Sequence, residues 1–423
     1  MKRWCHRAVL LAFVAGPVPL GGQRPAPVPG ENLQVYLMTM GAGAEIYERF
    51  GHNAIWIRDT VAHTDLVYNY GMFTFGRTFA DLVGFGARFA MGPQQYWLGY
   101  DDLERTLQLY QSVRRDVAAQ ELNLAPAQRA DLAARLATNA LEANRYYAYD
   151  YFRDNCSTRV RDMLDLELGG ALRRAAVGKP ADGTLRFHTL RSITNNFALF
   201  IFIDAAFGPR VDRPLDQWDE MFLPAKVQQR VRELTVAGPD GREAPLVKRE
   251  LSMLSINAFH VEPAPPDWGG PLVLASLVVA GLIRLSQSRR GVGMVGRAIG
   301  GAWVLLTGLG GVILLFFWVF TSHVATYGNR HLLLLSPLAL LLVSSFWFRR
   351  GAVPRPWVPR VAMVLMASVA IGVVLAIFPR IAGQQTAVLA EFTALPSFVA
   401  ALEALRGWNR RQGERVQEAQ GGG

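Results

Sequence analysis

The chain has 423 residues, of which 51% are hydrophobic and 18% charged, and its 44 Lys and Arg against 34 Asp and Glu give a net charge of +10. This composition excludes a disordered chain and a collagen-like fibre, and only 2 Cys exclude a disulfide scaffold. The excess charge lies in residues 268–423, with 14 Arg, no Lys and 4 Glu, whereas residues 1–267 are neutral. A neutral first part offers no basic face to a nucleic-acid backbone, so no nucleic-acid partner is expected.

The first 22 residues are typical of a secretory signal peptide. The basic segment MKRWCHR precedes an apolar core over residues 8–20 and two glycines. An uncleaved anchor is the alternative, but an apolar stretch this short and interrupted by proline is not expected to span a bilayer. Residues 23–32 are rich in Pro and Gly, which indicates a linker.

Residues 33–262 predict an exported domain of the α+β class, with strands gathered early and helices around them. Segments 33–40, 52–59 and 65–73 are rich in β-branched and aromatic residues and predict strands. A polar turn at residues 59–64 predicts that the last two strands form a hairpin.

Two helices are also expected in this domain. Leucines and alanines spaced by four predict an amphipathic helix over residues 126–142. A second helix is expected to begin in the segment DNC at residues 154–156, where Asp154 or Asn155 can cap it.

Residues 268–380 contain apolar runs of about the length needed to cross a bilayer. Three are clear, at 298–320, 332–348 and 361–378, and a shorter run at 271–285 is expected to form a fourth helix. The prediction is a bundle of about four transmembrane helices. In the tail 381–423, the acidic residues Glu391 and Glu403 favour an amphipathic helix on the membrane surface over a fifth span.

Arginines give this bundle an orientation. Eight of them lie in two loops, at residues 284–297 and 349–360, whereas the intervening loop 321–330 has only Arg330. Loops rich in Lys and Arg stay in the cytoplasm. The exported domain therefore lies on the opposite side, which agrees with the predicted signal peptide.

Cys156 is the cysteine that remains after signal cleavage, and it is the candidate nucleophile. A small buried core residue is the alternative interpretation. However, Cys156 follows the capping residue Asn155, so its sulfur lies in the first turn of a helix. The positive end of the helix dipole lowers the pKa of a thiol and favours the nucleophilic thiolate.

His52 is the candidate base, because it opens a predicted strand that would hold its ring on a rigid element. A structural strand histidine is the alternative. Asn69 lies diagonally opposite on the same face of the expected hairpin and could orient the imidazole, although a register shift of one residue would put Tyr68 or Tyr70 there. The Cys156 backbone N–H could contribute to an oxyanion hole.

The loop between two spans carries four polar candidates on the exported side: His323, Tyr327, Asn329 and Arg330. An ordinary interfacial loop is one interpretation. The other is a polar patch that faces the thiol and binds lipid headgroups or assists proton transfer. No cluster has metal-ligand spacing and no glycine-rich nucleotide motif is found, so neither a metal nor a cofactor is expected.

The order His then Cys, with FGHNAIWIRD, YNYGMF and DNCSTR, resembles the Lnb N-terminal periplasmic domain family over about residues 34–224. That family is similar to circularly permuted papain-like thiol enzymes, NlpC-type peptidases and lecithin:retinol acyltransferases. Residues 331–337, with His323 and Asn329 before them, resemble the membrane half of the same proteins. The resemblance implies a permuted papain-like exported domain followed by the helical bundle.

The resemblance further implies a lipoprotein N-acyltransferase of the bacterial inner membrane, with a phospholipid as acyl donor and a lipoprotein as acceptor. Cys156 matches the nucleophile, His52 matches the base, and Asn69 lies in a matching motif. The expected reaction passes through an acyl-Cys156 thioester. A membrane-anchored NlpC-type hydrolase of cell-wall peptides or lipid esters is an alternative, and a non-catalytic membrane scaffold is another.

Overall fold

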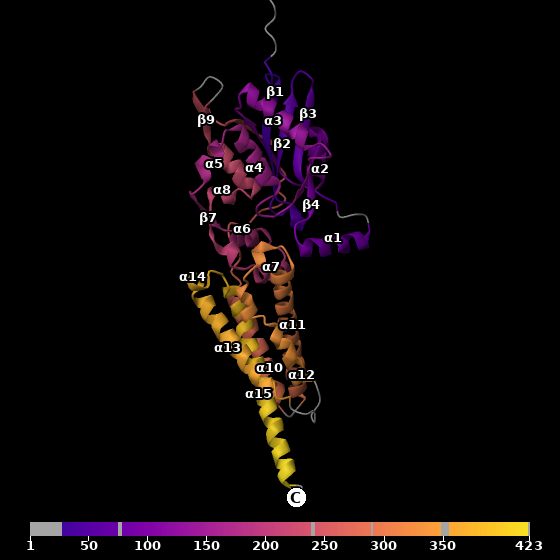
Figure 1. Ribbon diagram of the computed structural model, residues 1–423, viewed down its shortest axis with the longest axis vertical. Coiled ribbons are helices and arrows are strands. Elements are labelled where there is room, and N and C mark those ends of the chain that lie inside the picture. The colour runs from indigo at the N-terminus through magenta and orange to yellow at the C-terminus, as the bar shows by residue number, and fades with distance from the viewer. Residues whose placement is uncertain (1–27, 75–77, 238–241, 289–290, 348–354, 422–423) are drawn as a thin grey trace, which may run out of the picture.

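The computed structural model describes residues 28–74, 78–237, 242–288, 291–347 and 355–421. A domain built on a sheet and a bundle of long helices lie end to end (Figure 1). The predicted signal peptide at residues 1–22 lies outside the described residues.

A seven-stranded antiparallel sheet forms the centre of the N-terminal domain, in the order β11-β5-β1-β2-β3-β4-β6. Its strands are β1 Leu33–Met40, β2 His52–Asp59, β3 Thr64–Met72, β4 Gln95–Asp102, β5 Val117–Leu122, β6 Tyr146–Ala148 and β11 Val247–Leu254. β2 and β3 pair with Ile55 opposite Tyr68. The predicted hairpin is therefore confirmed.

Both faces of the sheet are covered, because alternate side chains of its strands enter two different cores. Val35 of β1 packs with Leu132 and Leu136, whereas Tyr36 packs on the other face with Tyr110. Helices α3 (Pro126–Asn139), α4 (Cys156–Glu167) and α9 (Pro224–Glu233) cover the first face, and α2 (Leu103–Ser112) covers the second. Both predicted helices of this domain are confirmed.

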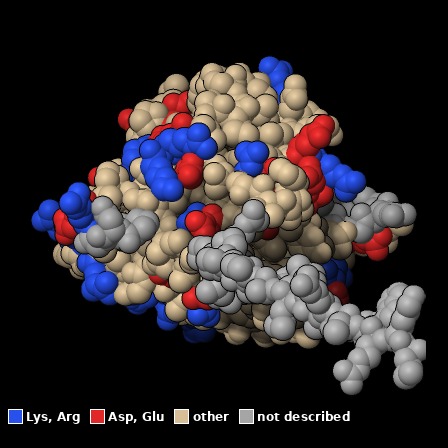
Figure 2. Space-filling model, turned by 90° about the horizontal axis from the view of Figure 1, so that it is seen from above, with Lys and Arg blue, Asp and Glu red and all other residues tan. Residues whose placement is uncertain are grey.

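Shorter elements surround this sheet and connect it to the bundle (Figure 1). The helices are α1 Phe79–Met91, α5 Ala171–Ala176, α6 Leu185–Ser192, α7 Phe197–Ala206 and α8 Gln217–Glu220, with 3-10 turns η1 Ile46–Glu48 and η2 Pro209–Asp212. Two small sheets pair β7 Pro180–Thr184 with β8 Pro214–Asp216, and β9 Thr235–Ala237 with β10 Glu243–Pro245. Basic and acidic side chains are interspersed on the end of the domain away from the bundle, as its neutral composition implies (Figure 2).

The described residues contain five helical segments long and apolar enough to cross a membrane. They are Gly269–Gln287, Val292–Phe320, Arg330–Trp347, Val358–Ile377 and Ala387–Glu418. The corresponding elements are α10 Gly269–Arg284 with η3 Leu285–Gln287; α11 Val292–Phe320; η5 Arg330–Leu333, η6 Pro337–Leu342 and α12 Val343–Trp347; α13 Val358–Ile377; and α15 Ala387–Gly421. The connections include η4 Val324–Thr326 and α14 Pro379–Ala382.

The fifth helix corrects the expectation of about four spans and an interfacial tail. Its residue Glu403 is fully buried in the bundle, where its carboxylate lies 3.3 Å from the Arg284 guanidinium and 2.7 Å from that of Arg406. Pairing with a basic group offsets much of the cost of removing a carboxylate from water. Glu403, whose charge made a membrane span unexpected, is thus paired with Arg284 of α10.

Candidate active site

Asn155 positions Cys156 at the start of α4. The Asn155 side-chain oxygen accepts hydrogen bonds from the backbone N–H groups of Ser157 and Thr158, both at 2.9 Å. Its amide nitrogen donates to the Phe222 carbonyl at 3.0 Å, so the cap is also tied to the loop before α9. Asn155 is therefore the cap, and the half-buried Cys156 thiol occupies the first turn of the helix.

His52 begins β2 directly after a glycine with an unusual backbone conformation. Gly51 has a φ of +84°, and a Cβ at this position would lie 2.7 Å from the Met40 carbonyl oxygen. Only glycine allows this approach without strain. The next residue, Asn53, is fully buried, and its side chain donates to the Met38 carbonyl at 3.2 Å. The backbone on both sides of His52 is thus held in place.

Asn69 of β3 meets the imidazole of His52. The His52 Nε2 lies 3.2 Å from the Asn69 side-chain oxygen, while the Asn69 amide nitrogen donates to the Val67 carbonyl at 3.2 Å. An amide oxygen only accepts, so the contact assigns the proton to Nε2 and leaves Nδ1 as the ring nitrogen with a free lone pair. The register of the hairpin puts Asn69 diagonal to His52, and the structure brings the two side chains together.

The environment of Cys156 favours its thiolate. Burial raises the pKa of the Cys156 thiol, but the charge of His52, a hydrogen bond from its ring, the backbone N–H of Asn53 and the Ser157 hydroxyl lower it to about 7. A thiol with a pKa of about 7 is ionised to a large extent at neutral pH, and the thiolate is the nucleophilic form. The described residues thus assemble an activated thiol, an imidazole and an orienting amide.

A buried tyrosine borders the thiol on the side of β3. A Cβ at Gly71, which has a φ of +88°, would lie 3.5 Å from the Cys156 Cβ and 3.8 Å from the Tyr147 oxygen. The Tyr147 hydroxyl is buried next to the backbone N–H of Gly71, which can only donate, and among the described residues no group accepts the hydroxyl proton. Burial and the nearby Cys156 thiolate raise its pKa well above the ordinary value. The hydroxyl therefore keeps a proton that it can donate.

Two family models match this chain, and they divide it where the fold does. The Lnb N-terminal periplasmic domain matches residues 26–196, and the Lnb transmembrane domain matches residues 267–401. The chain belongs to the Lnb family. It is therefore a multi-pass membrane protein with a periplasmic N-terminal domain, and this Lnb domain contains Cys156, His52 and Asn69.

Neither the curated proteins nor the solved structures contain a match to this Lnb chain. The expected likeness of its periplasmic domain to circularly permuted papain-like enzymes therefore stays a prediction. Membership of the Lnb family is compatible with an enzyme. The described residues contain no group of three or more His, Cys, Asp and Glu side chains that could hold a metal ion.

The loop 321–330 of the Lnb transmembrane domain packs between the two halves of the protein. His323 is buried, with its Nε2 2.6 Å from the Phe89 carbonyl oxygen of α1. The Tyr327 hydroxyl donates to the Thr321 carbonyl within the loop at 2.7 Å. This part of the loop contacts the periplasmic domain, and it is not the open polar patch that the sequence suggested.

Asn329 and Arg330 also lie in this contact. The buried Asn329 amide donates to the Ala205 carbonyl at the end of α7 at 2.7 Å, and the Arg330 backbone N–H donates to the Gln384 side chain at 2.8 Å. Among the described residues, the hydrogen bonds of this loop do not reach the thiol. All four loop candidates lie near this interface, but only His323 and Asn329 form side-chain hydrogen bonds to the residues that precede the bundle. The cited hydrogen bonds of Tyr327 and Arg330 stay within the loop and the bundle.

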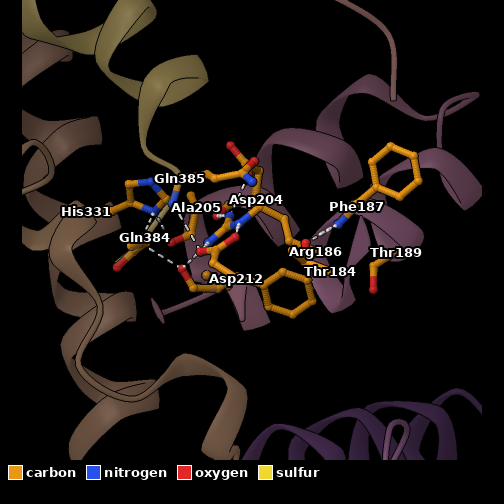
Figure 3. A network of polar contacts seen from close by, with 12 residues as sticks. Thr184, Arg186, Phe187, Thr189, Asp204, Ala205, Asp212, His331, Gln384 and Gln385 are labelled. Atoms are coloured by element: carbon orange, nitrogen blue, oxygen red, sulfur yellow. Dashed lines mark hydrogen bonds and ion pairs between the residues drawn. The ribbon is translucent and has the colours of Figure 1, made fainter. Parts of the chain in front are cut away.

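A buried ion cluster completes this interface, and sequence patterns did not reveal it (Figure 3). Arg186 of α6 is 1% exposed, and its guanidinium lies 2.5 Å from the Asp204 carboxylate and 2.8 Å from that of Asp212. Asp212 also accepts the backbone N–H of Gln385 at 3.1 Å, and His331 bonds to the carbonyl of the residue after Asp204. The cluster thus connects the periplasmic domain directly to the membrane bundle.

Proposed function

We propose that this Lnb-family protein is a cysteine-dependent acyltransferase of the bacterial inner membrane. It moves an acyl chain from a phospholipid to the N-terminal cysteine amine of a lipoprotein. The observation that supports the proposal is that His52 contacts both Cys156 and Asn69, in a domain that is joined to a membrane bundle. An enzyme that acts on lipid esters gains from a thiol held next to the bilayer.

The first half-reaction acylates the enzyme. His52 Nδ1 takes the proton from the Cys156 thiol, and the thiolate attacks the carbonyl carbon of a phospholipid ester. The tetrahedral oxyanion collapses as the ester C–O bond breaks. His52 then returns the proton to the leaving alkoxide, which departs as a lysophospholipid, and an acyl-S-Cys156 thioester remains.

The second half-reaction transfers the acyl chain to the lipoprotein. The amine of a diacylglyceryl-cysteine attacks the thioester carbonyl carbon, and His52 takes a proton from the attacking nitrogen. When the C–S bond breaks, the thiolate regains a proton from His52. The products are an N-acylated lipoprotein and the free Cys156 thiol, so the cycle needs no other reactant.

The oxyanion of both steps needs hydrogen-bond donors aimed at one point. The Cys156 backbone N–H is a candidate, because the first N–H groups of a helix have no acceptor within the helix. The buried Tyr147 hydroxyl borders the same thiol, and among the described residues no group accepts its proton. We assign these two groups to the oxyanion, with the Asn53 backbone N–H directed at the sulfur.

The proposal is tested with the full-length protein in phospholipid nanodiscs and a diacylated lipopeptide. Mass spectrometry is expected to detect a triacylated lipopeptide, a lysophospholipid and an acyl group on Cys156. The Cys156→Ala and His52→Ala variants are expected to give no product. As a matched control, His63→Asn replaces an exposed histidine in the β2–β3 turn, whose φ of +53° suits asparagine, and is expected to keep the wild-type rate.

Other outcomes separate the alternatives. An acyl-enzyme that passes its chain only to water would identify a hydrolase. A triacylated product made by Cys156→Ala would overturn the thiol mechanism. If cells with Cys156→Ala and His52→Ala kept the full cellular function of the protein, the non-catalytic scaffold would be correct.

A further inference from the structure

Helix α1 exposes apolar side chains although it belongs to the periplasmic domain. Thr78 caps its start by accepting the Asp81 backbone N–H at 3.1 Å, and Asp81 and Arg88 are its only charged residues. Among the side chains of α1 that the structure describes, three large apolar ones are exposed: Val83 at 54%, Phe89 at 38% and Met91 at 50%. Helix faces in contact with water normally carry polar residues, so this composition points to an apolar environment.

The C-terminal end of α1 is fastened to the outer end of the membrane helix α11. The Ser322 backbone N–H donates to the Met91 carbonyl at 3.0 Å, and His323 contacts the Phe89 carbonyl. α1 runs across the direction of the membrane helices, beside the end of the bundle (Figure 1). The last residue of α11, Phe320, is 64% exposed, so α11 exposes apolar side chains up to the segment that holds the end of α1.

The other side of α1 leads toward the thiol. Phe85 stacks on Phe73, which follows β3, with ring centroids 5.9 Å apart, and Phe73 packs against Tyr96 at 5.0 Å. Tyr96 stacks on Tyr149 at 4.2 Å. Tyr149 and Cys156 pack against the same hydrophobic core. A continuous row of aromatic rings thus connects α1 to the nucleophile.

We propose that α1 is an interfacial helix that lies in the outer leaflet of the membrane, with Val83 and Met91 among the lipid chains and Phe89 stacked on Phe85 at the edge of this face. The partner is the lipid bilayer itself, because the C-terminal end of α1 is hydrogen-bonded to the segment directly after α11, a helix long and apolar enough to cross it. α1 thereby brings the lipid surface to the aromatic row beside Cys156. This delivery role rests on the proposed acyltransfer, whereas the position of α1 does not.

The position of α1 is tested by spin labelling of the full-length protein in nanodiscs of phosphatidylethanolamine and phosphatidylglycerol. Both native cysteines are replaced by serine, and a single cysteine replaces Val83. The label is expected to collide more often with oxygen, which concentrates in lipid, than with a water-soluble nickel chelate. The matched control is Val61, an exposed valine in the β2–β3 turn, where the chelate is expected to dominate.

Two results would overturn this position. A label at Val83 that is as accessible to the chelate as the label at Val61 would place α1 in water. A label that is protected from both reagents would indicate a protein partner, such as a second copy of the chain. Neither labelling result depends on whether the protein transfers acyl chains.

The delivery role is tested by Val83→Glu, since a carboxylate is costly in the apolar part of a membrane. The variant is expected to slow acyl transfer from bilayer phospholipid by at least about tenfold, whereas Val61→Glu is expected to have no effect. The Cys156 alkylation rate reports whether the thiol site is intact and is expected to be unchanged in Val83→Glu. An unchanged transfer rate in Val83→Glu would overturn the delivery role. If the wild type transfers no acyl chain, the proposed function fails, and the labelling result still decides the position of α1.

Discussion

The His52 imidazole and the Asn69 amide oxygen lie 3.2 Å apart, because a hairpin of two paired strands folds their side chains onto one face. This contact selects the tautomer in which Nε2 carries the proton. The lone pair of Nδ1 is then available to the Cys156 thiol.

Asn69→Ala removes this acceptor and is expected to lower kcat by roughly tenfold to a hundredfold with little change in KM, because the ring loses its preferred tautomer. Asn69→Asp keeps an oxygen acceptor and is expected to restore most of the rate. Steady-state kinetics with the diacylated lipopeptide measure both. A wild-type kcat for Asn69→Ala would show that the imidazole is oriented by another group.

The pKa of Cys156 can be measured from the pH dependence of its alkylation rate. The rate with iodoacetamide is expected to rise with pH to a plateau, with a midpoint at a pKa of about 7. His52→Gln removes the two largest contributions that lower this pKa and leaves burial, which raises it, opposed only by the Asn53 backbone N–H and the Ser157 hydroxyl, so the midpoint moves to higher pH. Cys156→Ser corrects for background labelling, and an unchanged midpoint in His52→Gln would contradict the contact between the two residues.

The Tyr147 hydroxyl is assigned to the oxyanion, so Tyr147→Phe is expected to slow acylation by about a hundredfold. The alkylation of Cys156 is expected to be nearly unchanged, since no oxyanion forms in that reaction. Tyr70→Phe is a matched control, because Tyr70 lies in the same aromatic cluster but its hydroxyl is hydrogen-bonded to Asn139 at 3.0 Å. Equal losses in the two variants would indicate a packing effect.

Arg186 is ion-paired with two buried carboxylates, and Arg186→Leu removes the cation that both of them share. The expected loss is about 3–5 kcal/mol in the free energy of unfolding, seen as a lower Tm of the full-length protein in detergent. Arg58→Leu is the control, because Arg58 is half-exposed and lies 3.7 Å from its partner Asp65. That exposed pair is expected to contribute less than about 1 kcal/mol. Similar Tm values for both variants would mean that the buried cluster adds little stability.

Five spans and a periplasmic first domain put the C-terminus in the cytoplasm. A fluorescent protein that folds only in the cytoplasm is expected to be active after residue 423 and in the loop 349–360, which the arginines also place inside. The same reporter in the loop 321–330 is expected to be inactive. An inactive reporter after residue 423, with an active one in the loop 349–360, would support a bundle of four spans instead.

The parts of this protein that could be predicted depend on residues close in the chain. Cys156 at a helix start follows from Asn155 beside it, and the His52–Asn69 contact follows from a short hairpin. Caps, turns and strand alternation act over a few residues, so their signals survive in the sequence alone. The orientation of the bundle was likewise visible, because positive charge in a loop acts locally on membrane insertion.

The remaining features depend on packing between distant segments. The charge of Glu403 argued against a membrane span in the sequence, but in the structure Arg284 from another helix pairs with it. No local pattern marks Arg186 as the centre of the interface, or Tyr147 as a neighbour of the thiol. The sequence by itself therefore determined which residues carry reactive groups and on which side of the membrane they lie. Only the tertiary structure decided which of them meet, because burial and pairing energies depend on neighbours that folding alone brings together.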